Sequence, residues 1–335
     1  MSPQTIVVIG ATGSQGGAVV KELLANRDLY HVRAITRDVT KPASQKLAAL
    51  GAEVRSADLN SGSDALAQVF AGADGIFALT DFWQTQSTAT EIAQGRAIAD
   101  AAARTETLKH FVWSALPDPV KLSNGQLLNI HHWKGKSLVT EYIQKEHPEL
   151  WAKTTTVLFP NYFENCITTP DRYLPQKDAN GAYTLSFPHS PETVMPNVAI
   201  ADTGKLVHTI LQAGSKYFTK TIAFYSEALS ESEKLAKIGS QYNVPTKYQK
   251  LSSRECQELL ESRDGMSPEI ALDFTEQLMM FELFGNVYAN KEFVQAREVC
   301  GSPFCPSDFL TELLTTPRYL GSHFKPGRSS FAKMT

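Results

Sequence analysis

Short runs of apolar and β-branched residues recur between Thr5 and Phe159, and longer stretches with helical spacing separate them. Several of these runs are apolar at consecutive positions, which is typical of strands that are covered on both faces of a sheet. The runs that predict strands are Thr5–Ile9, His31–Ile35, Ala52–Ser56, Gly75–Leu79, Lys109–Trp113 and Thr154–Phe159.

The segments between these runs carry the periodicity of helices that are apolar on one face. Val19, Val20, Leu23 and Leu24, for example, share a face of the first segment. Strands that alternate with helices of this length favour right-handed crossovers between parallel strands. The pattern therefore predicts an α/β fold with a Rossmann-type, doubly wound parallel sheet.

The regular alternation stops at about Pro160, because the segment 160–200 is rich in proline. We expect a Rossmann-type domain at residues 1–159 and a smaller C-terminal α/β domain mainly at 160–320. Residues 321–335 have the composition of a loose tail. Thr221–Tyr225 is a further strand-like run that can return to the sheet, and Ser230–Gln241 and Ala271–Ala289 are expected helices.

Composition excludes several classes of protein. The formal net charge of −3 gives no electrostatic reason to expect nucleic acid or an anionic membrane as a partner. No apolar run reaches the roughly 18–20 residues that span a bilayer. The four cysteines match neither a redox nor a zinc motif, and the histidines lack metal-ligand spacing, so we expect no metal site. A reducing, cytoplasmic compartment is the simplest expectation, and a nuclear location would be possible only if the protein had a regulatory role.

The first strand run leads into a glycine-rich turn that opens a helix, Gly10-Ala11-Thr12-Gly13-Ser14-Gln15-Gly16. In this context glycines allow a tight turn, a close approach of the backbone to a pyrophosphate, and packing of the helix on the strand. The N-terminus of the helix then presents free N–H groups to the phosphates. The alternative is a plain strand-to-helix turn, since the spacing is G-x-x-G-x-x-G.

The end of the second strand run selects the dinucleotide. A carboxylate there would bind the ribose hydroxyls of NAD, but the position holds Thr36-Arg37. A guanidinium pairs with a 2′-phosphate, and Lys41 can assist it, so we expect NADP(H) as the preferred cofactor. NAD(H) remains possible if Asp38 turns inward. Asp58 and Leu59 are placed either to reach the adenine edge or, for Asp58, to cap a turn.

With its later motifs, the chain resembles the NmrA-like family, atypical members of the extended short-chain dehydrogenase/reductase superfamily. The resemblance covers about residues 4–315. It rests on Gly10–Gly17, Thr36-Arg37, Asp58-Leu59, His131–Tyr142 (HHWKGKSLVTEY), Pro160–Asn165 (PNYFEN) and Asp202-Thr203-Gly204. The glycine motif is shared across the superfamily, and the combination with H-x-x-x-K and PNYFEN is much more specific.

The resemblance implies a place for each site residue. Thr80 and the following Asp81-Phe82-Trp83 would lie beside the cofactor, and Lys136 would reach the nicotinamide ribose. The residues that would cradle the pyrophosphate are Gly10, Thr12, Gly13, Ser14, Gln15 and Gly16. The residues that would border the nicotinamide are Pro160, Asn161, Tyr162 and Phe163.

The catalytic residues are less clearly defined. Related reductases use a Tyr-x-x-x-Lys pair with a serine, whereas here Ser114 and Lys136 are present and His132 stands at the tyrosine position. An imidazole can donate a proton near neutral pH, so either His132 or Ser114 would handle the proton while Lys136 holds the ribose.

The chain is thus either an NADPH-dependent reductase or a redox-sensing regulator that binds a protein partner. For a reductase, Phe82, Trp83 and Tyr162 would form an aromatic pocket for a hydrophobic carbonyl or imine. The sequence does not predict the oligomeric state.

Overall fold

The computed structural model describes residues 2–300 and 323–324. Cys305 and the expected tail at 321–335, apart from residues 323–324, lie outside the described residues. The chain forms two units, each described by itself. Within the described residues, the first unit comprises 2–160, 200–225 and 288–300, and the second comprises 161–199, 226–287 and 323–324.

A parallel sheet of eight strands forms the centre of the first unit, so the predicted α/β class is confirmed. All six predicted runs between Thr5 and Phe159 contain strands, and Thr221–Ala223 joins the sheet beside the sixth. The sheet order is β14-β11-β6-β5-β4-β1-β2-β3. The strands are β1 (Gln4–Val8), β2 (Tyr30–Thr36), β3 (Glu53–Ser56), β4 (Gly75–Ala78), β5 (His110–Ala115), β6 (Thr154–Leu158), β11 (Thr221–Ala223) and β14 (Val294–Gln295).

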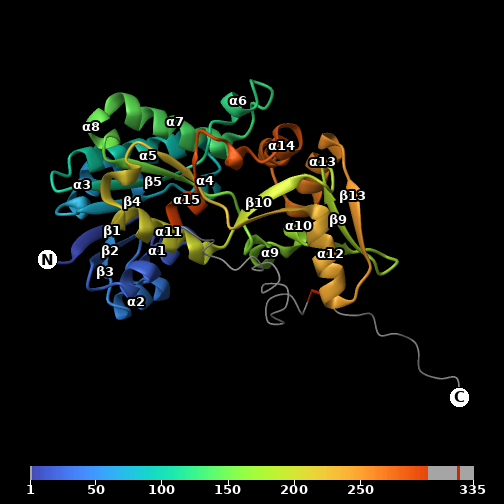
Figure 1. Cartoon of the computed structure of the whole chain (residues 1–335), viewed down its shortest axis with the longest axis horizontal. Helices are drawn as coiled ribbons and strands as arrows, with labels where there is room; N and C mark the ends of the chain where they lie inside the picture. The colour runs from blue at the N-terminus through green and yellow to red at the C-terminus, as the bar shows by residue number, and fades with distance from the viewer. Residues whose placement is uncertain (1, 301–322, 325–335) are drawn as a thin grey trace, which may run out of the picture. The chain divides into compact units, whose positions relative to one another are not determined.

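Helices cover both faces of this sheet (Figure 1). Helix α1 (Ser14–Ala25) packs against α11 (Ile200–Gln212) on one face, and α5 (Thr88–Ala103) packs between α3 (Gly62–Phe70) and α7 (His131–Glu146) on the other. The remaining helices are shorter. They are α2 (Pro42–Ala49), α4 (Phe82–Thr85), α6 (Pro119–Leu122), α8 (Pro148–Trp151) and α15 (Ala296–Cys300), with single 3₁₀ turns at Leu59–Ser61, Gly214–Tyr217 and Val287–Ala289.

Helical glycines permit the close approach of these layers. A Cβ atom at Gly204 would lie 2.3 Å from the carbonyl oxygen of Ala18, so α11 can approach α1 only with glycine there. A Cβ atom at Gly95 would lie 2.4 Å from Cγ2 of Val139, which limits the contact between α5 and α7 in the same way. The glycine of the Asp202-Thr203-Gly204 motif therefore has a packing role.

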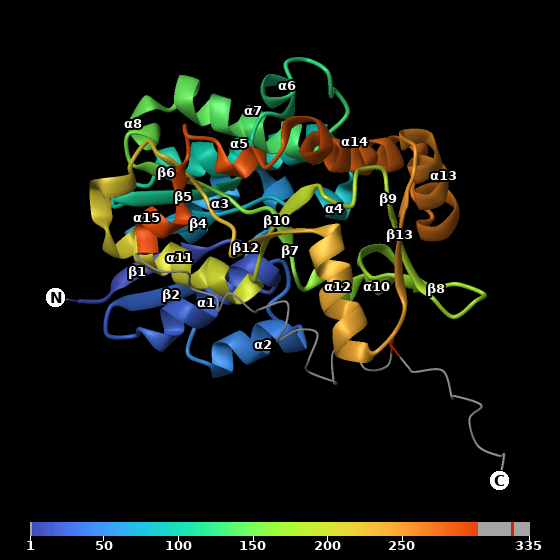
Figure 2. The ribbon, with the colours of Figure 1, turned by 45° about the vertical axis from the view of Figure 1, so that its right-hand side comes forward.

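The second unit contains, within its described residues, two small sheets ordered β12-β10-β7 and β13-β9-β8, with helices beside them (Figure 2). Several of these helices begin at local caps; Ser230 and Glu233, for instance, form a capping box at the start of α12. The strands are β7 (Asn161–Tyr162), β8 (Gln176–Lys177), β9 (Tyr183–Phe187), β10 (Val194–Val198), β12 (Glu227–Ser230) and β13 (Thr246–Lys250). The helices are α9 (Asn165–Thr168), α10 (Pro170–Tyr173), α12 (Glu231–Tyr242), α13 (Ser253–Asp264) and α14 (Pro268–Phe284).

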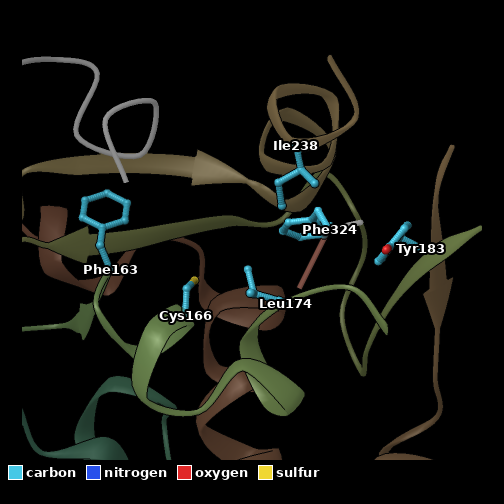
Figure 3. Packing of buried hydrophobic residues seen from close by; sticks show 6 residues of the cluster. All are labelled: Phe163, Cys166, Leu174, Tyr183, Ile238 and Phe324. Atoms are coloured by element: carbon cyan, nitrogen blue, oxygen red, sulfur yellow. The ribbon is translucent and has the colours of Figure 1, made fainter. Parts of the chain in front are cut away.

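A compact apolar cluster lies between the elements of the second unit (Figure 3). Its buried members include residues of α9, β9 and α12 and of the segments that follow β7 and α10, and each is less than a tenth exposed. They are Phe163, Cys166, Leu174, Tyr183, Ile238 and Phe324. Burial raises the pKa of the Cys166 thiol to about 11, so this cysteine is a packing residue rather than a reactive one.

Candidate functional site

The carboxyl ends of the central strands bring most of the predicted site residues to one edge of the sheet. Strand β1 pairs with β2 on one side and with β4 on the other, so the order of the chain reverses at β1. Such a reversal leaves a crevice at the carboxyl ends of the strands, where open α/β sheets bind their ligands. The glycine turn follows β1, Arg37 follows β2, Thr80 follows β4, and Ser114 lies near the end of β5.

The glycine turn has the geometry of a tight, close-packed loop. Gly10 has φ +64°, in the left-handed region, and its carbonyl oxygen accepts a hydrogen bond from the Gly13 amide at 2.9 Å. A Cβ atom at Gly16 would lie 2.3 Å from that same oxygen. The left-handed backbone at Gly10 favours glycine there, and the close approach of the Gly10 carbonyl oxygen leaves no room for a side chain at Gly16.

The N-terminus of α1 is open to solvent. Gly13, the N-cap residue, has no side chain to satisfy the first amides, and the first turn contains no acidic residue. Thr12, Gly13 and Ser14 are exposed. The first N–H groups of a helix need an external partner, and an anion satisfies both these groups and the helix dipole. The residues present fit a pyrophosphate.

A side-chain hydrogen bond connects the glycine turn to the end of β5. The Ser114 hydroxyl donates to Oε1 of Gln15 at 2.7 Å, and Ser114 is only 2 % exposed. One predicted catalytic residue thus contacts one predicted cofactor residue directly.

The end of β2 presents Arg37 to solvent, and Lys41 is an exposed residue immediately before α2. Asp38 does not turn inward here, because its Oδ1 atom accepts hydrogen bonds from the amide and hydroxyl of Thr40 at 2.8 and 2.6 Å. These bonds hold the pKa of the Asp38 carboxyl below its usual range. The carboxylate that would favour NAD is therefore engaged in its own turn.

Two other carboxylates near this edge act as helix caps. Asp58 accepts from the Asn60 amide at 2.9 Å and begins the 3₁₀ turn Leu59–Ser61. Asp81 accepts from the Trp83 amide at 3.2 Å and begins α4. Asp58 thus has a local capping role, and its reach to the adenine edge stays a prediction. For Asp81 the place beside the cofactor stays a prediction, and its side chain already has a local function.

Lys136 belongs to a buried polar cluster of three side chains. Its ammonium group forms an ion pair with Oε1 of Glu91 and lies 3.3 Å from the Thr80 hydroxyl. That hydroxyl donates to the same Glu91 oxygen at 2.9 Å. The Lys136 side chain is 11 % exposed and that of Glu91 is 1 % exposed.

Glu91 is a functional candidate that the sequence reasoning missed. A carboxylate in the first turn of a helix resembles any solvated helical acid until its burial is known. The signal that could have found it is the glycine at 135, since a Cβ atom there would lie 2.3 Å from Oε2 of Glu91. A glycine beside a candidate lysine in a long helix can mark a large buried neighbour.

His132 lies among aromatic rings one helical turn before Lys136. Its ring centre is 5.0 Å from that of Trp83 and 5.9 Å from that of Phe82. Phe82 is buried, whereas Trp83 is 43 % exposed. Among the residues predicted to form the substrate pocket, Trp83 therefore has a ring that a ligand can reach. Phe82 is buried and packs against His132.

The Pro160–Phe163 segment crosses from one unit to the other. Pro160 belongs to the first unit, and Asn161, Tyr162 and Phe163 belong to the second. There Asn161 donates to Asn197 at 2.9 Å and accepts from Asn165 at 2.7 Å, and Phe163 lies in the apolar cluster of Figure 3 with 3 % exposure. The place of these residues beside a nicotinamide stays a prediction.

Two absences hold for the part of the chain that the structure describes. No three His, Cys, Asp or Glu side chains gather as metal ligands would. None of the helices in residues 2–300 combines the length and apolarity that crossing a bilayer requires.

Comparison with known proteins gives a consistent result. A model of the NmrA-like family matches residues 2–300. The NmrA-like family domain-containing oxidoreductase ptmS of Penicillium ochrochloron is 31 % identical over 241 residues, which cover 66 % of this chain and 68 % of the relative.

Two solved structures share the fold at lower sequence identity. The negative transcriptional regulator NmrA in complex with NAD is 21 % identical, with a TM-score of 0.74 and coverage of 97 % of this chain and 99 % of that one. An NADPH-dependent quinone oxidoreductase of Escherichia coli in complex with NADPH is 19 % identical, with a TM-score of 0.69 and coverage of 92 % and 99 %. At these identities the likeness establishes the fold. The family match over almost the whole chain establishes more: this protein belongs to the NmrA-like family.

Proposed function

We propose that this protein is an NADP(H)-dependent reductase of a hydrophobic carbonyl or imine substrate. The observation that carries the proposal is the Ser114–Gln15 hydrogen bond of 2.7 Å, because it connects a residue that can orient a carbonyl with the turn that fits a pyrophosphate. The relative ptmS, named as an oxidoreductase, supports the same class of activity.

The choice of cofactor rests on the end of β2. Arg37 is exposed there and Asp38 is held by Thr40, so a 2′-phosphate would meet a guanidinium rather than a carboxylate. Lys41 adds a second positive charge at the start of α2. The fold neighbours are described in complex with NAD or with NADPH, which is compatible with a preference for NADP(H) that still allows NAD(H).

The chemistry divides among three side chains of this chain. The bound cofactor supplies a hydride. Lys136 would donate a hydrogen bond to the nicotinamide ribose, and His132 would give the proton to the developing oxyanion. Ser114 would orient the substrate carbonyl by turning its single hydroxyl hydrogen from Gln15 to that oxygen. The exposed Trp83 ring beside His132 offers a flat apolar surface, which favours a planar or hydrophobic substrate.

A second candidate function is a redox-sensing regulator that binds a protein partner. The observation that favours it is His132 at the position where related reductases have tyrosine. The fold neighbour described as a negative transcriptional regulator supports this alternative.

Calorimetric titration of the cofactor-stripped protein with NADP⁺, NADPH, NAD⁺ and NADH tests these proposals. Preference for the phosphorylated pair, with NADPH bound at least as tightly as NADP⁺, supports a reductase. A strong preference for oxidised over reduced forms supports sensing, because it gives a free-energy difference between the redox states that the binding of a partner could use. Binding of none of the four overturns both functions.

A variant then separates catalysis from binding. We expect His132→Gln to retain NADPH affinity and to lose most turnover of any carbonyl compound that the wild-type protein reduces. Unchanged turnover would remove His132 as the proton donor.

A further inference from the structure

The buried cluster of Thr80, Glu91 and Lys136 joins three parts of the first unit. Thr80 follows β4, Glu91 lies in the first turn of α5, and Lys136 lies in α7. Measured over the whole residue, backbone included, each of the three is less than a tenth exposed. The position of the Lys136 ammonium group is thus determined by two other elements and not by its own flexible side chain.

The hydrogen bonds in this cluster leave one donor for a ligand. An ammonium group has three N–H bonds. One points to Oε1 of Glu91 and a second to Oγ1 of Thr80, whose own hydrogen is donated to Glu91. Lys136 can therefore keep both partners and still donate its third hydrogen to a ribose hydroxyl.

The stability of the fold does not explain why Glu91 is buried. Removing a carboxylate from water is costly, and a buried ion pair often contributes little to net stability. The second carboxylate oxygen, Oε2, has no hydrogen-bond partner among the described residues, which adds to the cost. The protein also keeps a glycine at 135, since a side chain there would displace Oε2.

From these contacts we infer that Glu91 is a positioning residue, which fixes the Lys136 ammonium group so that its remaining hydrogen points to the nicotinamide ribose. This inference rests on the proposed cofactor function. Glu91 itself does not contact the cofactor. It acts through Lys136, and the Thr80 hydroxyl helps to hold the same ammonium group by accepting a second hydrogen bond from it.

Two probes that differ in the ribose test this role. NADPH contains the nicotinamide ribose, whereas adenosine 2′,5′-bisphosphate contains only the adenosine end. We expect Glu91→Gln to weaken NADPH binding about tenfold and to leave binding of the bisphosphate within about twofold of wild type. Equal weakening of both probes would show a general structural defect and would overturn the inference.

A double-variant cycle tests whether Glu91 acts through Lys136. The variant Glu91→Gln/Lys136→Met leaves no unpaired buried charge, so it keeps the measurement available if Glu91→Gln alone fails to fold. We expect its NADPH affinity to equal that of Lys136→Met, because the effect of Glu91 requires the lysine. Losses that simply add would contradict the inference.

The control is Glu141→Gln, in the same helix as Lys136. Glu141 is paired with Lys121 at 2.9 Å on a more exposed part of α7, so this change should leave the affinity for both probes at the wild-type value. Absence of NADPH binding by the wild-type protein would contradict the proposed function. Binding by wild type and Glu91→Gln with equal affinity would overturn the role of Glu91 alone.

Discussion

Arg37 is the residue on which the choice between the two dinucleotides depends. We expect Arg37→Ala to cost NADP⁺ binding about 1.5–3 kcal/mol, the usual value of a hydrogen bond to a charged group. This corresponds to roughly 10- to 150-fold in dissociation constant. The affinity for NAD⁺ should hardly change, since NAD⁺ has no 2′-phosphate. Calorimetric titration of both nucleotides measures the difference.

Arg104→Ala is the matched control for this change. Arg104 is also an exposed arginine, but it lies at the C-terminal end of α5 and pairs with Asp64 at 2.7 Å. Arg104→Ala should therefore leave the affinity for both NADP⁺ and NAD⁺ at the wild-type value. An equal loss of NADP⁺ and NAD⁺ affinity in Arg37→Ala would contradict the assignment of Arg37 to the 2′-phosphate.

At the scale of residues, the sequence predicts the glycine turn, but it does not predict whether a given carboxylate binds a ligand, caps a helix or is buried. The backbone geometry requires glycine at positions 10 and 16. The spacing of the glycines after a strand is enough to predict this turn. Asp58 and Asp81 have capping roles, because the same short carboxylate that binds a ligand also accepts from nearby amides. Only the glycine at 135 indicates Glu91 in the sequence, and indirectly, since the importance of Glu91 depends on its burial against α7, a helix that is distant from it in the sequence.

At the scale of elements, the close contact between α5 and α7 depends on Gly95. Its Cβ atom in a Gly95→Ala variant would lie 2.4 Å from Cγ2 and 3.1 Å from Cβ of Val139, whose branched side chain has little freedom to move. We expect a loss of about 1–3 kcal/mol in the free energy of unfolding, as is typical of overpacking. Denaturant unfolding followed by circular dichroism measures it.

Gly17→Ala is the control for the helical substitution itself. A Cβ atom at Gly17 would meet its nearest neighbour, the carbonyl oxygen of Ala11, at an ordinary 3.5 Å. Alanine is favoured over glycine within a helix by about 1 kcal/mol, so this variant should be as stable as wild type or more so. If Gly95→Ala is equally stable, steric crowding at Val139 does not limit the contact of the two helices.

The elements of the two units differ in how far the sequence predicts them. Strands β4, β5 and β6 are buried throughout, and β1 and β2 are buried over most of their length, so the signal of these strands is local. In the second unit, β7 and β8 contain two residues each, too few for any periodicity. Strand β7 pairs with β10 and β8 pairs with β9, so their positions are set by partners outside their own local sequence.

At the scale of the whole molecule, the chain leaves the first unit after Pro160 and returns to it twice, at residues 200–225 and 288–300. The strand-like run at Thr221–Tyr225 indicates the first return. The second return includes β14, which has two residues and pairs with β11, a strand far earlier in the chain. A strand this short pairs only because the rest of the sheet provides an edge for it, so the local sequence contains no pattern that predicts the pairing.

The pH dependence of global stability should reflect His110, a buried residue of the central strand β5. Burial lowers the pKa of His110 from 6.5 to about 4. Its Nε2 atom lies 2.8 Å from the Thr155 hydroxyl, which donates its own hydrogen to the carbonyl oxygen of Tyr217. Nε2 therefore carries the hydrogen of a neutral imidazole, and burial disfavours the addition of a second, charging proton.

The sign of the effect follows from proton binding. Between pH 6.5 and about 4 the unfolded chain binds a proton at His110 and the folded chain does not, so stability decreases as the pH falls through this window. At about 1.36 kcal/mol per pKa unit, the neutral histidine contributes about 3 kcal/mol above pH 6.5 that is absent below pH 4. Unfolding by denaturant at a series of pH values measures this decrease.

His110→Gln isolates the contribution, because an amide can still donate to Thr155 and does not titrate. The variant should lose less stability than wild type between pH 6.5 and 4, even if it is less stable at pH 7. His189, in the second unit, also has a pKa below its usual value because it is buried, so wild type and variant must be compared at each pH. Parallel curves for the two proteins would mean that His110 is not the group whose protonation destabilises the first unit.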